Sequence, residues 1–173
     1  MKISIIRFLG PAALALAAVF VVPGAARAQT ELSFGGGIMD YDLAGTGQTL
    51  TLNARAVMPL SRTFALEPGI VWAQPELQGG GGATLLIPEV QLQANFPIGP
   101  VAPYLGLGVG AALAFADEDS GGDDREIAFS GGAGLRVDAG GLLGLVVDGR
   151  VHGFGTSFGG STAELTVGLR IRR

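Results

Sequence analysis

The sequence contains no cysteine, so the protein forms no disulfide bonds and offers no thiol for lipid attachment. Lysine is absent after Lys2, and arginine is not clustered. Because contacts with phosphates supply most of the affinity for nucleic acid, this composition argues against a nucleic-acid partner. Apolar residues at helical spacing are also missing after Gln29, so the sequence does not predict a helical fold.

The first 28 residues have the three parts of a secretory signal peptide. Two basic residues precede an apolar run over 8–22, and an A-x-A cleavage site stands at 26–28. A retained membrane anchor is the alternative, but this run is interrupted by Pro11 and is shorter than the roughly 20 residues of a spanning helix. We therefore expect residues 1–28 to be a signal peptide and 29–173 to be one domain.

The domain over 29–173 is acidic. Three of the 11 basic residues lie in the signal peptide, which leaves 8 arginines against 15 acids and a net charge of −7. Glycine is abundant but does not follow a Gly-X-Y repeat, which excludes collagen. The many large aliphatic residues argue against disorder.

Alternation of apolar and polar residues with a period of two recurs eight times in this domain, which predicts eight β-strands. Each run is close to the 9–11 residues with which a tilted strand crosses a bilayer. The predicted strands are 31–41, 49–58, 64–73, 84–96, 103–116, 126–138, 142–153 and 162–172.

One phase of the alternation is apolar in every run, and the charged residues take the other phase, with Asp40 as the exception. The pattern indicates a sheet with one oily and one ionic face. Pro68 and Pro88 fall inside two of the runs. Because each removes a backbone donor from the ladder, we expect β-bulges there.

The connections alternate in character. Compact turns at 59–62, 97–103 and 138–141 alternate with longer polar or glycine-rich stretches at 75–83 and 117–125. Short turns on one side and long loops on the other are typical of transmembrane barrels, in which the turns and both termini face the periplasm.

Aromatic residues in the apolar phase lie near strand ends, which predicts two interfacial girdles. Eight residues, or about 26 Å at ~3.3 Å per residue, separate Phe64 from Trp72, which after tilt approaches the apolar band of ~25 Å. The predicted girdle on the turn side comprises Phe34, Phe64 and Phe96, and the one on the loop side comprises Trp72, Phe115 and Phe129.

A soluble lipocalin-like barrel is the structural alternative, and it requires the inverse polarity, with an apolar lumen and a polar exterior. Unpaired arginines and glutamates inside such a small apolar cup would be very costly. The sequence therefore predicts an all-β fold, a closed eight-stranded antiparallel up-and-down transmembrane β-barrel, in which every backbone group is paired as lipid requires.

The stretch "PYLGLGVGAA" at 103–112 and the ending "ELTVGLRIRR" at 164–173 resemble the small eight-stranded outer-membrane barrels of the OmpA and OmpX type. The resemblance covers the whole of 29–173. It implies location in the outer membrane of a Gram-negative bacterium, contact with lipid and lipopolysaccharide, and insertion by the barrel-assembly machinery. We expect a monomer without cofactor or metal, in a non-enzymatic role in envelope structure or surface interaction.

The glycines at 106, 108 and 110 are spaced G-x-G-x-G, whereas a dinucleotide-binding turn needs G-x-G-x-x-G between a strand and a helix. They instead leave the inward face of a strand bare. We expect long polar residues of other strands to fill this room and plug the lumen, since eight strands enclose little space. A narrow wet channel is the alternative. The predicted network comprises Arg55, Glu67, Glu89, Gln91, Gln93, Arg136, Asp148, Arg150, His152, Glu164 and Arg170.

His152 is the single histidine, and it allows a second hypothesis. Some outer-membrane lipid A deacylases have a histidine two residues before a nucleophilic serine. Here that position is Phe154, and Ser157 and Ser161 lie beyond it, so the spacing does not ensure that base and nucleophile meet. We expect His152 to belong to the lumen network.

The acidic stretch at 117–125 has Asp117 and Asp119 spaced as in a calcium loop, but Ala128 stands where the bidentate glutamate would be. A solvated surface loop is the main interpretation, and weak binding of divalent cations is the alternative.

Overall fold

A computed structural model describes residues 30–43, 45–76, 82–116, 124–155 and 159–172. The predicted signal peptide lies outside these residues. The strands are β1 (Glu31–Asp42), β2 (Thr46–Pro59), β3 (Phe64–Ala73), β4 (Ala83–Asn95), β5 (Val101–Ala116), β6 (Asp124–Asp138), β7 (Leu143–Phe154) and β8 (Gly160–Arg172). Each predicted strand is confirmed, with ends that differ by at most three residues.

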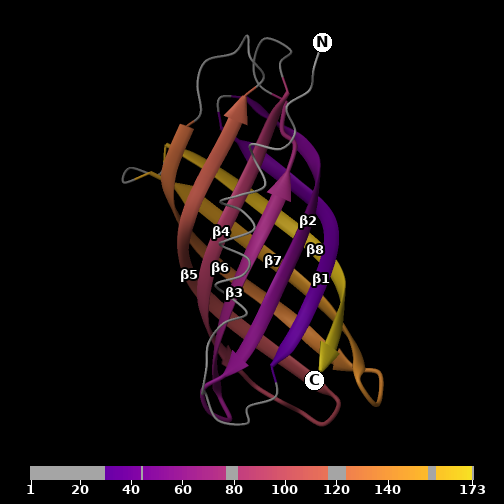
Figure 1. Ribbon diagram of the computed structural model, residues 1–173. Helices are drawn as coiled ribbons and strands as arrows, with labels where there is room; N and C mark the ends of the chain where they lie inside the picture. The colour runs from indigo at the N-terminus through magenta and orange to yellow at the C-terminus, as the bar shows by residue number, and fades with distance from the viewer. Residues whose placement is uncertain (1–29, 44, 77–81, 117–123, 156–158, 173) are drawn as a thin grey trace, which may run out of the picture.

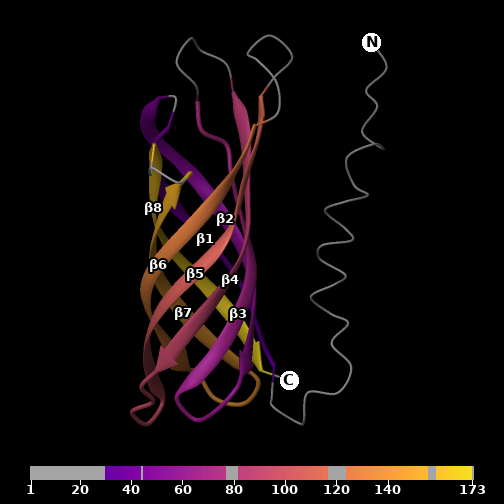
Figure 2. The same cartoon turned by 90° about the vertical axis from the view of Figure 1, so that its left-hand side faces the viewer.

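The eight strands form one closed antiparallel barrel in which each strand pairs with its neighbours in sequence, and β8 pairs with β1 (Figure 1). The predicted up-and-down barrel is confirmed. Viewed from the side, the strands cross the long axis obliquely (Figure 2). No helix in the described part of the chain is long and apolar enough to span a membrane.

The register fixes how steeply the strands tilt. One row of partners runs from Ser33 on β1 to Gly160 on β8, through Arg55, Gly69, Glu89, Gly110, Ala128 and Phe154. Gly160 precedes the partner of Asp42, so the row returns to β1 at position 43, ten residues beyond 33. With strands ~4.8 Å apart, this stagger tilts the strands by about 40°, and a 12-residue strand then covers about 30 Å of the axis, enough for the apolar core of a bilayer.

The expectation of β-bulges at the two prolines is wrong. Two residue pairs are missing from the β2–β3 ladder beside Pro68, and the pairing continues beyond the gap with the same offset. The β4–β5 ladder has the same kind of gap beside Pro88. On its other side each proline keeps a regular partner, Val90 for Pro68 and Ile70 for Pro88. The missing donors are accommodated by a local gap in one ladder, which needs no extra residue.

The compact turns join strands at the end that also holds the C-terminus (Figure 1). Glycines with positive φ stand where these turns reverse the chain: Gly99 in the β4–β5 turn, and Gly140 and Gly141 in the β6–β7 turn. An L-residue with a side chain rarely adopts such angles, so glycine allows these short connections.

The outer surface is apolar. Its exposed large residues come from every strand, and Leu50 and Leu107 are among the most exposed. Asp40 also points outward, as expected, and accepts a hydrogen bond from Gln48 Nε2 at 2.9 Å near the loop end. An exterior of this kind suits hydrocarbon and not water. The six aromatic residues of the predicted girdles occupy the outward phase of their strands: Phe34, Phe64, Trp72, Phe96, Phe115 and Phe129. Their depth in a bilayer stays a prediction.

Candidate functional site

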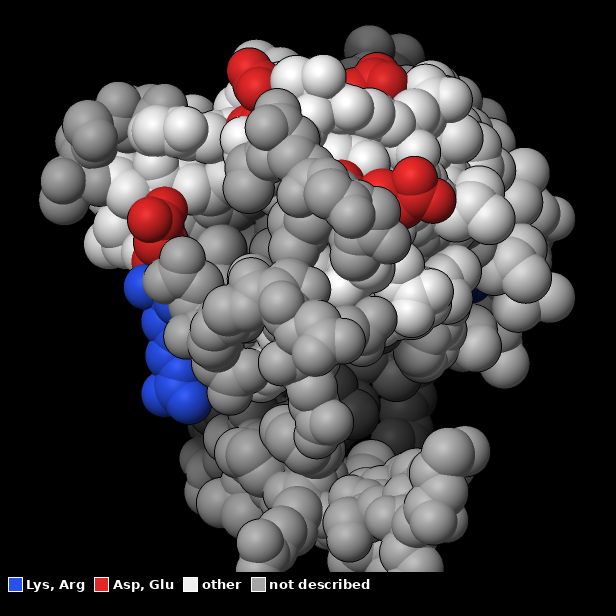
Figure 3. Space-filling model, turned by 90° about the horizontal axis from the view of Figure 1, so that it is seen from above, with Lys and Arg blue, Asp and Glu red and all other residues white. Residues whose placement is uncertain are grey.

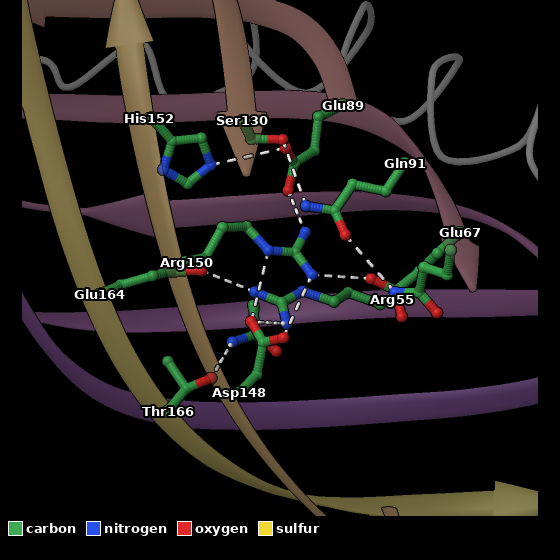
Figure 4. A network of polar contacts seen from close by, with 12 residues as sticks. Arg55, Glu67, Glu89, Gln91, Ser130, Asp148, Arg150, His152, Glu164 and Thr166 are labelled. Carbon is green, nitrogen blue, oxygen red and sulfur yellow. Dashed lines mark hydrogen bonds and ion pairs between the residues drawn. The ribbon is translucent and has the colours of Figure 1, made fainter. Parts of the chain in front are cut away.

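The lumen gathers the polar side chains of the barrel. Every residue of the predicted network points inward, and none is more than 5% exposed. The structure brings most of them into one connected set of hydrogen bonds and ion pairs (Figure 4). We call seven ionic members the charged layer: Arg55, Glu67, Glu89, Arg136, Asp148, Arg150 and Glu164.

Arg150 on β7 is the centre of the charged layer. Its guanidinium donates to Glu89 Oε1 through Nη1 and to Glu67 Oε1 through Nη2, the latter at 2.8 Å. Its Nε lies 3.3 Å from Asp148 Oδ1. One arginine thus faces carboxylates from β3, β4 and its own strand, because β7 lies across the narrow lumen from β3 and β4.

Arg55 on β2 makes a second link across the lumen. Its Nη1 donates to Asp148 Oδ1 and its Nη2 to Glu164 Oε1, each at 2.6 Å. Glu164 Oε2 also lies 3.4 Å from Thr51 Oγ1. Asp148 therefore joins the Arg55 and Arg150 systems into one network.

Arg136 on β6 extends the network toward the turn end. Its Nη2 donates to Glu67 Oε2 at 3.1 Å and to Gln93 Oε1 at 2.5 Å. Its guanidinium carbon lies 4.0 Å from the centre of the Tyr104 ring, a cation–π contact. Tyr104 donates to Asp148 Oδ2 at 2.5 Å and is buried. Sequence reasoning missed this tyrosine, although it shares the inward phase of the glycines on β5.

The charged layer contains three guanidiniums and four carboxylates, and each carboxylate accepts at least one charge-assisted hydrogen bond. Buried ions are tolerable only when paired and hydrogen-bonded in this way. Arg55 contacts two of the carboxylates and Arg150 contacts three, so loss of either arginine weakens several ion pairs at once.

The glycines make room for these side chains, chiefly beneath their paired neighbours. A Cβ on Gly69 would lie 2.8 Å from Arg55 Cγ, and a Cβ on Gly35 would lie 2.9 Å from Asn53 Oδ1. Each of these glycines is the cross-strand partner of the residue above it. The long side chains therefore cross the adjacent glycine before they reach the axis, whereas we expected them to fill distant glycine positions.

Arg170 lies at the turn end, apart from the charged layer. Its Nη1 donates to Glu31 Oε2 at 2.5 Å, and its Nη2 contacts Asp138. Arg172 donates to the same two carboxylates, at 3.0 Å to Glu31 and 2.9 Å to Asp138. The four side chains link the first strand, the last strand and the β6–β7 turn.

His152 sits in the lumen beside Glu89. Its Nε2 lies 3.5 Å from Glu89 Oε2, its Nδ1 lies 3.2 Å from Thr162 Oγ1, and its ring stacks on Phe154. Ser130 donates to Glu89 Oε2 at 2.6 Å, so the carboxylate lies between the histidine and this serine. A hydrolase requires the base to contact the nucleophile.

The serines considered for hydrolysis lie elsewhere. Ser161 is exposed and in the outward phase of β8, opposite to the fully buried His152. Ser157 lies outside the described residues. Ser130 is the cross-strand partner of His152, but its hydroxyl bonds to Glu89, and no hydrogen bond joins His152 to a serine among the described residues.

The lumen toward the loops is apolar, which sequence reasoning missed because it treated the whole inward face as polar. We call this cluster the apolar cap: Met39, Val71, Ala73, Leu85, Ile87, Ala112, Ala128 and Phe154. Leu43 packs against it. The signal was present in 84–96, where the inward phase changes from Leu85 and Ile87 to Glu89.

The described residues contain no group of three histidine, cysteine or acidic side chains placed to hold a metal ion. The calcium-like part of the acidic stretch, 117–123, lies outside the described residues.

No family model and no curated protein matches the sequence. Solved structures match the fold. The crystal structure of Neisserial surface protein A has a TM-score of 0.71 and 15% identity, over 83% of this chain and 97% of that chain. The Ail attachment invasion locus protein of Yersinia pestis has a TM-score of 0.56 and 15% identity, over 84% and 99%. The outer membrane enzyme PagL has a TM-score of 0.53 and 16% identity, over 82% and 98%.

These similarities confirm the fold expected from the sequence, that of the small eight-stranded outer-membrane barrels. One of the three proteins is an enzyme by its name, so the fold by itself does not decide between a catalytic and a structural role.

Proposed function

We propose that this protein is a non-conducting barrel of the bacterial outer membrane, with a non-enzymatic role in envelope structure or in surface interaction through its loops. The predicted signal peptide, the apolar exterior and the similarity of fold support this location. In this orientation the short turns face the periplasm and the loops face outward.

The observation that carries the proposal is the low exposure of the side chains that line the lumen. A ring of inward side chains, one from each strand, is at most 8% exposed: Met39, Thr51, Val71, Ile87, Ala112, Ala128, His152 and Thr162. A water-filled path along the axis would expose the side chains that line it. The low exposure of this ring therefore supports a plug.

Two barriers of different chemistry lie in series. The charged layer fills the middle of the lumen with ion pairs, and the apolar cap lies above it toward the loops. A hydrated ion would have to break the ion pairs of the charged layer and lose its water in the apolar cap. Both steps cost free energy.

Conductance across a planar lipid bilayer tests the proposal. We expect the purified, folded barrel to produce no steady current, while a porin inserted in the same way serves as the positive control. Reproducible current steps that scale with salt concentration would refute the plug and favour the narrow channel.

A lipid-modifying enzyme is tested separately. We expect mass spectra of lipid A to be the same in cells with and without the protein, because His152 is buried and makes no hydrogen bond to a described serine. The opposite result is that lipid A loses an acyl chain only when the protein is present and keeps it when the protein carries His152→Ala. That result would contradict the structural role and show that the protein is a hydrolase.

A further inference from the structure

The turn end of the barrel opens into a cavity of about 210 Å³. Its lining combines charged side chains with apolar ones, among them Val57, Ala65 and Ala102. We call the six ionic residues of this lining the basic mouth: Glu31, Arg62, Arg136, Asp138, Arg170 and Arg172. Arg136, which also belongs to the charged layer, and Arg170 are both buried.

The basic mouth carries four guanidiniums and two carboxylates, a net charge of +2. This contrasts with the net charge of −7 of residues 29–173. The described charges at the opposite end are mostly acidic and exposed, and acidic side chains are visible over that face in Figure 3. They are Asp40, Asp42, Glu76, Arg125 and Glu126. The barrel thus presents a basic periplasmic end and an acidic outer end.

Two arginines of the basic mouth have donors to spare. The Arg172 side chain is 34% exposed and uses Nε and Nη2 for Glu31 and Asp138, so Nη1 has no partner among the described residues. Arg62, on the β2–β3 turn, is exposed and makes no ion pair in the described part of the chain. Arg62 therefore has no side-chain hydrogen bond or ion pair among the described residues.

We propose that the basic mouth binds a carboxylate-bearing peptide segment of the periplasm, whose carboxylates pair with Arg62 and Arg172. The planar fork of arginine matches a carboxylate in a bidentate geometry. The apolar side chains in the lining suit the aliphatic part of such a segment. The cavity opens inside the ring of strands, whereas lipid headgroups lie outside the barrel wall, so a lipid phosphate does not enter it along the membrane surface.

Binding of a capped tetraglutamate peptide to the barrel in lipid nanodiscs tests the site, with a capped tetraglutamine peptide as the ligand control. NMR spectra of arginine Nε–Hε groups report contact with individual guanidiniums. We expect saturable shifts at Arg62 and Arg172 with tetraglutamate only. Arg62→Gln should weaken binding about tenfold, as expected for loss of a charge-assisted pair. Arg125→Gln, at the other end, should leave it unchanged.

Three outcomes would overturn the proposal. They are no saturable binding by the unmodified barrel, equal binding of the two peptides, and equal affinity in Arg62→Gln. Inorganic phosphate is added as a competitor at equal concentration, and complete displacement by it would indicate a general anion site in place of a peptide site. Unaltered heat-modifiable migration of the Arg62→Gln variant verifies that it is folded. The binding result does not depend on whether the lumen conducts.

Discussion

The lumen is divided between two regions that are held together by different physical means. The charged layer is held by directional bonds among a few ions, as in the Arg150 contacts with Glu67 and Glu89. The apolar cap is held by packing alone, as in the burial of Ile87 and Phe154. The first region is intolerant of the loss of any partner, while the second responds to lost volume.

This difference matters for specificity. A packed apolar cluster accepts other residues of similar volume, whereas the ion pairs require particular strands to face one another across the axis. Arg55 can reach both Asp148 and Glu164 only if β2, β7 and β8 take their observed register. We infer that the charged layer favours one register and the cap adds ordinary packing energy.

The largest expected effect is that of Arg150→Met, which keeps most of the volume but leaves Glu89 without an arginine and takes one of two arginines from Glu67 and from Asp148. Loss of one partner from a buried ion cluster costs about 3–5 kcal/mol. The free energy of unfolding is measured by urea titration in lipid vesicles, with the fluorescence of Trp72, the single tryptophan, as the signal. The deficit should shrink in acidic buffer, where protonation neutralises the stranded carboxylates.

The matched control is Arg62→Met, which removes an exposed arginine without an ion pair in the described structure. It should change the free energy of unfolding by no more than about 0.5 kcal/mol. A loss below about 1 kcal/mol for Arg150→Met would show that the charged layer is hydrated and not a dry network.

Ile87→Ala tests the cap. Ile87 is fully buried, so the truncation leaves a cavity and should cost about 2–4 kcal/mol in the same urea titration. Unlike that of Arg150→Met, this deficit should not depend on pH, because no charge is stranded. Leu60→Ala, on the exposed β2–β3 turn, is the control and should be nearly neutral. A deficit for Ile87→Ala that varied with pH would contradict the division of the lumen into two regions.

A double-mutant cycle of Arg55→Met and Glu164→Gln sharpens the comparison. The two side chains are paired at 2.6 Å, so we expect a coupling free energy of about 1–3 kcal/mol. The cycle of Arg55→Met with Ile87→Ala pairs one member of each region and should give nearly additive losses. If the losses of Arg55→Met and Glu164→Gln were additive, Glu164 would not be coupled to Arg55 and would not act as part of the charged layer.

Most of the fold followed from period-two alternation, since each side of a barrel wall meets a different medium. The pattern placed Arg55 and Leu107 on opposite faces without knowledge of their neighbours. It failed at Pro68 because a proline can be accommodated either by a bulge or by a gap in one ladder, and only the register distinguishes them.

The candidate site was less accessible to sequence reasoning. Alternation predicted that Arg150 and Glu89 point inward, but their pairing depends on which strands face each other across the axis. The apolar cap was missed because Met39 and Ile87 follow the same alternation as the charged residues, and their side chains differ only in chemistry. Tyr104 was missed because its ring lies over the glycine at 134, a contact that the register creates.

Tyr104→Phe is the mildest test, and it separates hydrogen bonding from packing in the charged layer. The phenylalanine ring keeps the contact with the Arg136 guanidinium, while the bond to Asp148 Oδ2 is lost. Asp148 still faces Arg55 and Arg150, so the free energy of unfolding should fall by about 1 kcal/mol. Tyr104→Leu, which also removes the ring over Arg136, should cost more. If the two variants were equal in the urea titration, the stacking of Arg136 on Tyr104 would add nothing, and the hydroxyl alone would account for the residue's place in the lumen.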